Sequence, residues 1–189
     1  MFAGSSSGIN TAHRDAAVAL ADALADRGIE LVYGGGCVGL MGVLADAMLA
    51  RGGRVIGVIP HTLMVREVGH RGLTDLKIVD SMHERKAMMA ELSDGFIALP
   101  GGFGTLEELF EILTWAQLGL HAHPCGALNV DGYFDSLLRF LDHALDQGFV
   151  RSAHRGMLLV DDDPRELLDR FVQYRAPTIA KWLQRSAQT

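Results

Sequence analysis

The chain changes from strand to helix within the stretch Phe96-Ile97-Ala98-Leu99-Pro100-Gly101-Gly102-Phe103-Gly104-Thr105-Leu106-Glu107-Glu108. Its apolar start is typical of a buried strand, and the apolar spacing from Leu106 onward is typical of an amphipathic helix. The proline and glycines between them predict a tight loop. Such a junction leaves unpaired backbone N–H groups at the positive end of a helix, and glycine lets a ligand approach them closely. We therefore expect an anion such as phosphate to bind here.

The same alternation of strand and helix runs through the whole chain. Parallel strands need crossover connections, so the pattern predicts a doubly wound, mainly parallel α/β sheet of the Rossmann-like class in a single domain, residues 1–189. Met1-Phe2-Ala3 reads as the end of a first strand. Further strands are expected at 29–33, 55–59, 76–79, 96–99, 125–130 and 157–160, helices at 11–27, 40–51, 81–92, 106–118, 133–147 and 164–174, and a short helical tail at about 177–189.

Composition narrows the class of partner. The 189 residues are 49% hydrophobic, which is enough for a sizeable core, and the net charge of -6 argues against a nucleic-acid partner. The two cysteines, Cys37 and Cys125, are typical of a reducing compartment, although a disulfide between them stays possible. No apolar run approaches the roughly 20 residues of a membrane span, and no signal peptide opens the chain. We expect a cytoplasmic protein without a membrane contact.

Glycine-rich loops follow three of the expected strands. Ligands of doubly wound sheets bind beyond the carboxyl ends of the strands. We therefore expect Gly4 and Ser5 of the first loop, and Gly35 and Gly36 of the second, to converge with Gly101–Gly104 on one crevice.

The second loop, Gly34-Gly35-Gly36-Cys37-Val38-Gly39, satisfies the G-x-G-x-x-G pattern of dinucleotide-binding proteins. That pattern also needs an acidic residue at the end of the next strand, which here ends Gly57-Val58-Ile59-Pro60. We therefore favour a nucleotide-phosphate site over an NAD(P) site. Ordinary turn chemistry is the alternative.

Thr105 and Glu108 allow two interpretations. T-x-x-E before an apolar run is a capping box, in which both side chains satisfy backbone amides of the helix. The preceding Pro-Gly-Gly-Phe-Gly clears space for a ligand, however, and favours a functional role for Glu108. Glu107 and Glu111 are interpreted as a solvated helix face, with ligand contact as the alternative.

A second capping box, Ser81 with Glu84, predicts the start of a helix. Arg85 and Lys86 follow in its first turn, where a cation is unfavourable unless an anion lies nearby. Both are therefore candidate ligand contacts. The histidines form no H-E-x-x-H motif and have no C-x-x-C partner, so we predict no metal site.

Together these motifs resemble the LOG family, the cytokinin riboside 5′-monophosphate phosphoribohydrolases long mislabelled as lysine decarboxylases. The resemblance rests on Val32 to Gly42, on Ser81 to Lys86 and on Pro100 to Glu108, and it extends from Ala3 to about Asp163. The family's full first strand is reduced here to Met1-Phe2-Ala3. No cofactor is expected: Lys77, Lys86 and Lys181 lack a recognisable pyridoxal setting, which speaks against a decarboxylase.

The resemblance implies hydrolysis of the N-glycosidic bond of a nucleoside 5′-monophosphate by a homodimer. It assigns catalysis to Arg85 and Glu108. It assigns substrate contacts to Glu67, Lys86, Gly101, Gly102, Phe103, Gly104, Thr105, Leu106, Glu107 and Thr114. A nucleotide or molybdopterin carrier that binds without catalysis is the alternative function.

Overall fold

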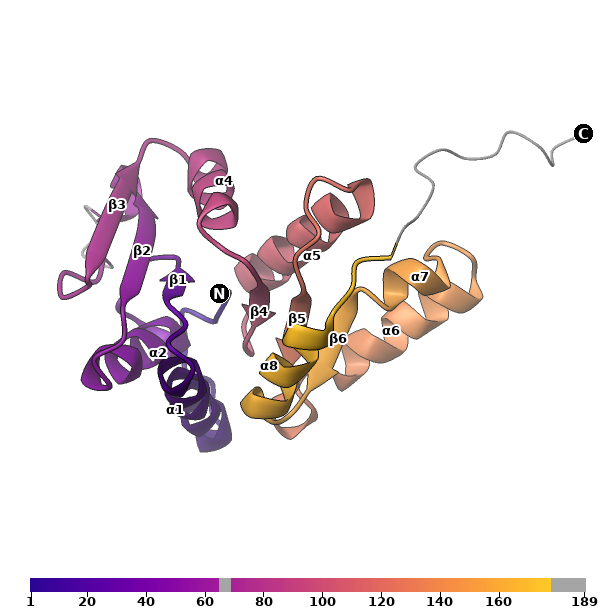
Figure 1. Ribbon diagram of the computed structural model, residues 1–189, viewed down its shortest axis with the longest axis horizontal. Helices are drawn as coiled ribbons and strands as arrows, with labels where there is room; N and C mark the ends of the chain where they lie inside the picture. The colour runs from indigo at the N-terminus through magenta and orange to yellow at the C-terminus, as the bar shows by residue number, and fades with distance from the viewer. Residues whose placement is uncertain (65–68, 178–189) are drawn as a thin grey trace, which may run out of the picture.

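The computed structural model describes residues 1–64 and 69–177, and strands and helices alternate along it (Figure 1). The strands are β1 (Leu31–Tyr33), β2 (Val55–Pro60), β3 (Asp75–Val79), β4 (Phe96–Ala98), β5 (Cys125–Leu128) and β6 (Leu158–Asp161). The helices are α1 (Thr11–Asp26), α2 (Gly39–Ala50), α3 (His61–Leu63), α4 (Met82–Glu91), α5 (Phe103–Leu118), η2 (Val130–Gly132), α6 (Asp135–Asp146), α7 (Ser152–Arg155) and α8 (Pro164–Gln173).

The first residues of the chain join two parallel sheets, β1-β2-β3 and β4-β5-β6. The amide of Phe2 donates to the carbonyl of Ile97 over 3.0 Å, and the amide of Leu99 donates to the carbonyl of Phe2 over 2.9 Å. On the other side, the amino group of Met1 donates to the carbonyl of Val32 over 2.8 Å. The order is therefore β3-β2-β1, then residues 1–3, then β4-β5-β6, with the connections running outward in both directions. This confirms the predicted doubly wound parallel class.

Alternate side chains of the central strands pack in two separate hydrophobic clusters, one on each face of the sheet. Leu31, Tyr33, Ile97 and Leu99 pack with the buried faces of α1, α2 and α8. Val32, Phe96 and Ala98 point the other way and pack with α4, α5 and α6. Because successive side chains of a strand face opposite sides, helices cover both faces of the sheet.

The predicted strands and helices lie within two residues of their observed limits, except that α5 begins at Phe103, three residues before its expected start. The strand expected at 125–130 ends at Leu128, because a 3-10 turn begins at Val130 and delays α6 to Asp135. The short helix α3 lies in the stretch 61–75, for which the sequence indicates a loop or a short helix, whereas α7 was not predicted. The expected tail helix lies outside the described residues beyond Pro177. Cys37 is exposed and Cys125 is buried, and neither forms a disulfide; burial raises the pKa of the Cys125 thiol to about 12.

Candidate functional site

The glycine loops that follow residues 1–3, β1 and β4 meet at the carboxyl ends of these strands. The amide of Gly4 donates to the carbonyl of Pro100 over 3.1 Å, and the amide of Leu40 donates to the carbonyl of Gly4 over 3.0 Å. The first loop is thus held between the other two. The structure confirms that they converge.

Two of the contacts between these loops require glycine. Gly39 has a φ of +61°, and an ideal Cβ there would lie 2.3 Å from the backbone carbon of Ser5. At Gly101, a Cβ would lie 2.1 Å from Oγ1 of Thr105 and 2.9 Å from the amide nitrogen of Gly4. At these two points the loops therefore pack backbone against backbone, where a side chain would not fit.

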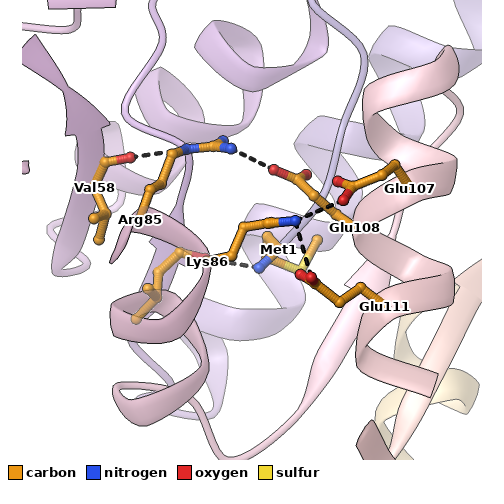
Figure 2. Close-up of polar contacts among 8 residues, drawn as sticks. Met1, Val58, Arg85, Lys86, Glu107, Glu108 and Glu111 are labelled. Atoms are coloured by element: carbon orange, nitrogen blue, oxygen red, sulfur yellow. Dashed lines mark hydrogen bonds and ion pairs between the residues drawn. The ribbon is translucent and has the colours of Figure 1, made fainter. Parts of the chain in front are cut away.

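Arg85 and Glu108 form a buried ion pair beside these loops (Figure 2). Nη1 of Arg85 donates to Oε1 of Glu108 over 2.5 Å, and Nε donates to the carbonyl of Val58 in β2 over 3.1 Å. The two side chains are only 9% and 10% exposed. Among the described residues, no hydrogen bond uses the other carboxylate oxygen of Glu108, so that oxygen is available to a ligand.

The local sequence explains how each member of the pair is placed. Oγ of Ser81 accepts from the amide of Glu84 over 3.1 Å, and Oε2 of Glu84 accepts from the amide of Asp80 over 2.9 Å. These bonds fix the start of α4 and confirm the capping function predicted for Ser81 and Glu84. Arg85 then extends from the first turn of α4 toward α5.

The capping interpretation of Thr105 and Glu108 is wrong. Helix α5 begins at Phe103, after Gly102, so Thr105 lies within the first turn and is buried. Glu108 lies further along the helix and faces Arg85 instead of the helix start. Because the glycine loop turns directly into the helix, it exposes the first amides of α5 without a capping side chain.

Lys86 connects α4 to α5 beside the buried pair (Figure 2). Its Nζ donates to Oε1 of Glu107 over 2.6 Å and to Oε1 of Glu111 over 2.9 Å. Burial acts to lower the pKa of Lys86, but the hydrogen bonds that Nζ donates to both carboxylates, together with their negative charges, raise the pKa above its ordinary value. Glu107 is 54% exposed, as the interpretation of a solvated face predicts, and Glu111 is 27% exposed. The ion pairs that both form with Lys86 were not predicted.

The other candidate residues lie at different depths. The carbonyl of Gly35 accepts from the amide of His70 over 2.8 Å, and Gly36 forms a β-bridge with Gly69. Phe103 is 95% exposed at the start of α5. Thr114 is exposed two turns beyond Glu108, and its hydroxyl donates to the carbonyl of Phe110. Glu67 lies outside the described residues.

Two tyrosines that the sequence did not single out also contact the glycine loops. The hydroxyl of Tyr33, at the end of β1, donates to the carbonyl of Gly36 over 3.1 Å, and burial raises its pKa. The hydroxyl of Tyr133 donates to the carbonyl of Gly101 over 2.6 Å. The only sequence signal near Tyr133 is the turn dipeptide Asp131-Gly132 before it. Nothing in the sequence pattern pairs this turn with the loop.

The assembled site combines the start of α5, where no side chain of the described residues caps the helix, with a buried carboxylate and two cations. It can hold an anion at the helix start and stabilise positive charge beside the carboxylate. Across residues 1–64 and 69–177, no three His, Cys, Asp or Glu side chains are placed to share a metal ion. In the same part of the chain, no helix has the length and apolar content needed to span a membrane.

Comparison with known proteins identifies the relatives of this chain. A family model described as "Possible lysine decarboxylase" matches residues 41–171. The chain is 52% identical over 174 residues to a probable cytokinin riboside 5′-monophosphate phosphoribohydrolase, LOGL3, of Oryza sativa subsp. japonica, covering 92% of this chain and 82% of that protein. It is 50% identical to the cytokinin riboside 5′-monophosphate phosphoribohydrolase LOG7 of Arabidopsis thaliana, covering 92% and 80%.

Solved structures with the same fold are more distant in sequence. The molybdenum cofactor binding protein from Rippkaea orientalis superposes with a TM-score of 0.65 at 20% identity, covering 90% of this chain and 92% of that chain. The Moco carrier protein from Chlamydomonas reinhardtii gives a TM-score of 0.66 at 19% identity, with the same coverage. At such identities the likeness concerns the fold alone.

Proposed function

Because this chain belongs to the LOG family of cytokinin riboside 5′-monophosphate phosphoribohydrolases, we propose that it hydrolyses the N-glycosidic bond of nucleoside 5′-monophosphates. The products are the free base and ribose 5-phosphate. The observation that carries the proposal is the buried Arg85–Glu108 pair at the meeting point of the glycine loops. A phosphate-binding loop next to an available carboxylate oxygen can bind a phosphorylated sugar, with the phosphate on the loop and the sugar beside the carboxylate.

The 5′-phosphate is held by backbone amides in this proposal. Helix α5 starts at Phe103 with unpaired N–H groups at its positive end, and Gly101, Gly102 and Gly104 leave them accessible. In this proposal Gly4 and Ser5 of the first loop, and Gly35 and Gly36 of the second, contribute further contacts to the phosphate. The phosphate thus lies on the amide side of α5, and the ribose extends toward Glu108.

Glu108 stabilises the charge that develops at the sugar. Breaking the glycosidic bond builds positive charge on C1′, and a carboxylate close to it stabilises this oxocarbenium-like state. The bond from C1′ to the base nitrogen breaks and takes its electron pair to the base. Water then adds to C1′, and the proton that it gives up passes to the base nitrogen, directly or by way of the Glu108 carboxylate, so that the base leaves neutral and the carboxylate is regenerated. Arg85 fixes the carboxylate through Nη1 and is itself fixed by the Val58 carbonyl.

The remaining substrate contacts are proposals of the same kind. Lys86, Glu107 and the exposed ring of Phe103 border the pair or the loop. Thr105 and Leu106 lie in the first turn of α5. Thr114 lies about 9 Å along the helix from Glu108, at a rise of about 1.5 Å per residue, and Glu67 completes the predicted set. Which of these residues contact the base and which contact the ribose would determine the preference for one nucleotide over another.

We also propose a cytoplasmic homodimer. The two unbonded cysteines support a reducing compartment. Leu118 and Leu120, at the end of α5 and just after it, are 50% and 66% exposed, which supports burial of this region against a second copy. Size-exclusion chromatography with light scattering tests the dimer: a mass of about 20.5 kDa instead of twice that value would contradict it.

A direct assay tests the proposed activity. Purified protein is incubated with AMP and, separately, with isopentenyladenosine 5′-monophosphate, and chromatography measures the free base. We expect base release from at least one nucleotide, and the ratio of the two rates reports specificity. Binding of the nucleotides by calorimetry without base release would overturn the proposal and favour the carrier function.

A further inference from the structure

Tyr133 reaches the glycine loop from a distant part of the chain. It lies between the 3-10 helix η2 and helix α6, and its hydroxyl donates to the carbonyl of Gly101, 32 residues away, over 2.6 Å. This bond is shorter than most hydrogen bonds between neutral groups. The phenol therefore holds one backbone carbonyl of the loop that the proposed function assigns to phosphate.

The turn that carries Tyr133 is held by its own side-chain bonds. Asp131 adopts a positive φ of 51°, which is uncommon for a residue other than glycine, and its Oδ2 accepts from Nδ2 of Asn10 over 2.6 Å. Oδ1 of Asn129 accepts from the amide of Phe134 over 2.7 Å. These bonds tie the turn to the start of α1 and fix the backbone on both sides of Tyr133.

The ring of Tyr133 is held between two others. It packs edge-on against His13 of α1, with centroids 5.5 Å apart, and against Phe134, with centroids 5.0 Å apart. Edge-to-face contacts at such distances are favourable and directional. The hydroxyl is therefore aimed at Gly101 by the packing of the ring as well as by the turn.

The bond to Gly101 fixes the direction of the next amide. In a trans peptide, the carbonyl of Gly101 and the N–H of Gly102 lie in one plane and point in opposite directions. A peptide between two glycines can rotate with little steric cost, because neither residue has a Cβ. By binding the carbonyl, Tyr133 directs the Gly102 N–H away from itself. The neighbouring carbonyl, that of Pro100, is bound by Gly4.

We propose that Tyr133 is a positioning residue of the phosphate-binding loop. It keeps the Gly101–Gly102 peptide in the orientation that offers the Gly102 N–H to the 5′-phosphate. This inference rests on the proposed function for the identity of the anion. It assigns Tyr133 to phosphate affinity and separates it from Arg85 and Glu108, which act at the sugar.

The test is Tyr133→Phe, which removes the hydroxyl and keeps the ring between His13 and Phe134. Calorimetry measures the affinity for AMP, ribose 5-phosphate and adenosine, and steady-state kinetics measures KM and kcat for AMP. Loss of one hydrogen bond predicts a roughly three- to tenfold weaker affinity for AMP and ribose 5-phosphate and a similar rise in KM. The affinity for adenosine and kcat stay within about twofold. Tyr174→Phe, the same change after α8, is the control and leaves all values unchanged.

The outcomes separate this inference from the proposed function. Equal losses for adenosine and ribose 5-phosphate would overturn it, because they indicate a general disturbance of the site, and so would unchanged affinities. If the parent chain binds ribose 5-phosphate but hydrolyses no nucleotide, the proposed activity fails while the comparison of Tyr133→Phe with the parent still decides the role of Tyr133. If the parent binds no phosphorylated ligand, the inference fails as well.

Discussion

Gly34 lies directly against the guanidinium of Arg85. An ideal Cβ on Gly34 would lie 2.0 Å from Nη2 of Arg85 and 3.1 Å from Cζ. Gly34 does not have a positive φ, so the need for glycine comes from this contact and not from the backbone conformation. The glycine after β1 thus provides the space in which the cation of the buried pair lies.

Gly34→Ala is therefore expected to displace Arg85 from Glu108. Misplacing a catalytic group by about 1 Å can lower a rate about a hundredfold, and we expect a loss of that order in kcat/KM for AMP. Chromatography of released adenine measures it. Gly156→Ala is the matched control, because a Cβ at Gly156 would lie no closer than 3.5 Å to any neighbouring atom, which is an ordinary contact distance. Equal activity of Gly34→Ala and the parent would show that the position of Nη2 is unimportant.

Glu108→Gln is expected to abolish base release but to retain nucleotide binding. The amide keeps the size of the side chain and can still accept from Arg85, but it carries no charge to stabilise the sugar cation. We expect kcat to fall by at least about a hundredfold while the affinity for AMP changes by less than about fivefold, measured by chromatography and calorimetry.

The control for this variant is Glu91→Gln, the same change at an exposed position at the end of α4. It should match the parent in both measurements. Turnover by Glu108→Gln at a rate close to that of the parent would remove the carboxylate from the mechanism.

The bridge from Lys86 to Glu107 and Glu111 predicts a dependence of stability on pH. Folding raises the pKa of Lys86 above its ordinary value of 10.5. Its stabilising contribution is therefore complete below the unfolded pKa and is lost as the pH rises through the folded value. Lys86→Met should lower the free energy of unfolding by at most about 1 kcal/mol, because Glu107 is half exposed and solvent weakens its ion pair with Lys86. The difference in unfolding free energy between the parent and Lys86→Met should be constant from pH 7 to 9 and shrink above about pH 10.5.

Thermal unfolding of the parent and Lys86→Met across this pH range measures the effect. Lys77→Met is the control, since Lys77 pairs with an adjacent carboxylate on β3 at the surface. A Lys86→Met difference that already disappears between pH 7 and 9 would mean that the pKa is lowered by burial instead of raised.

Local patterns predicted the elements of this fold because each pattern depends on neighbours in the chain. The capping bonds of Ser81 and Glu84, and the glycine loops after the strands, follow from spacing alone. Because the class of sheet fixes where strands end, the meeting of Gly4 with Pro100 was also predictable. The sequence pattern marked Arg85 and Glu108 separately as functional candidates and the family resemblance assigned both to catalysis, but neither predicted that the two side chains bond to each other.

Contacts between distant segments were beyond the sequence pattern. Thr105 and Glu108 have the spacing of a capping box. Only the observed start of α5 at Phe103 excludes a capping function for them. Glu107 and Glu111 have the spacing of a solvated face, but α4 places Lys86 against them. No sequence pattern connected Tyr133 with the glycine loop, because its partner there is a backbone carbonyl, which every residue carries.

The buried ion pair should be replaceable for stability but not for activity. Removing one member leaves the other buried and unpaired, so Glu108→Leu alone is expected to cost about 3–5 kcal/mol of unfolding free energy. Adding Arg85→Met removes the unpaired cation and replaces it with an apolar chain of similar length. Since apolar replacement of a buried pair is often neutral or stabilising, the double variant should recover to within about 1 kcal/mol of the parent.

Urea unfolding measures these three free energies, and the adenine assay measures activity. The double variant should release no base, because it lacks both the carboxylate at the sugar and the cation that fixes it. Near-parental stability of the double variant together with loss of base release would show that the pair is needed for the reaction and adds no net stability to the fold. If the double variant is as unstable as Glu108→Leu, the pair instead holds α4 against α5, and loss of activity in either single variant could no longer be attributed to the reaction.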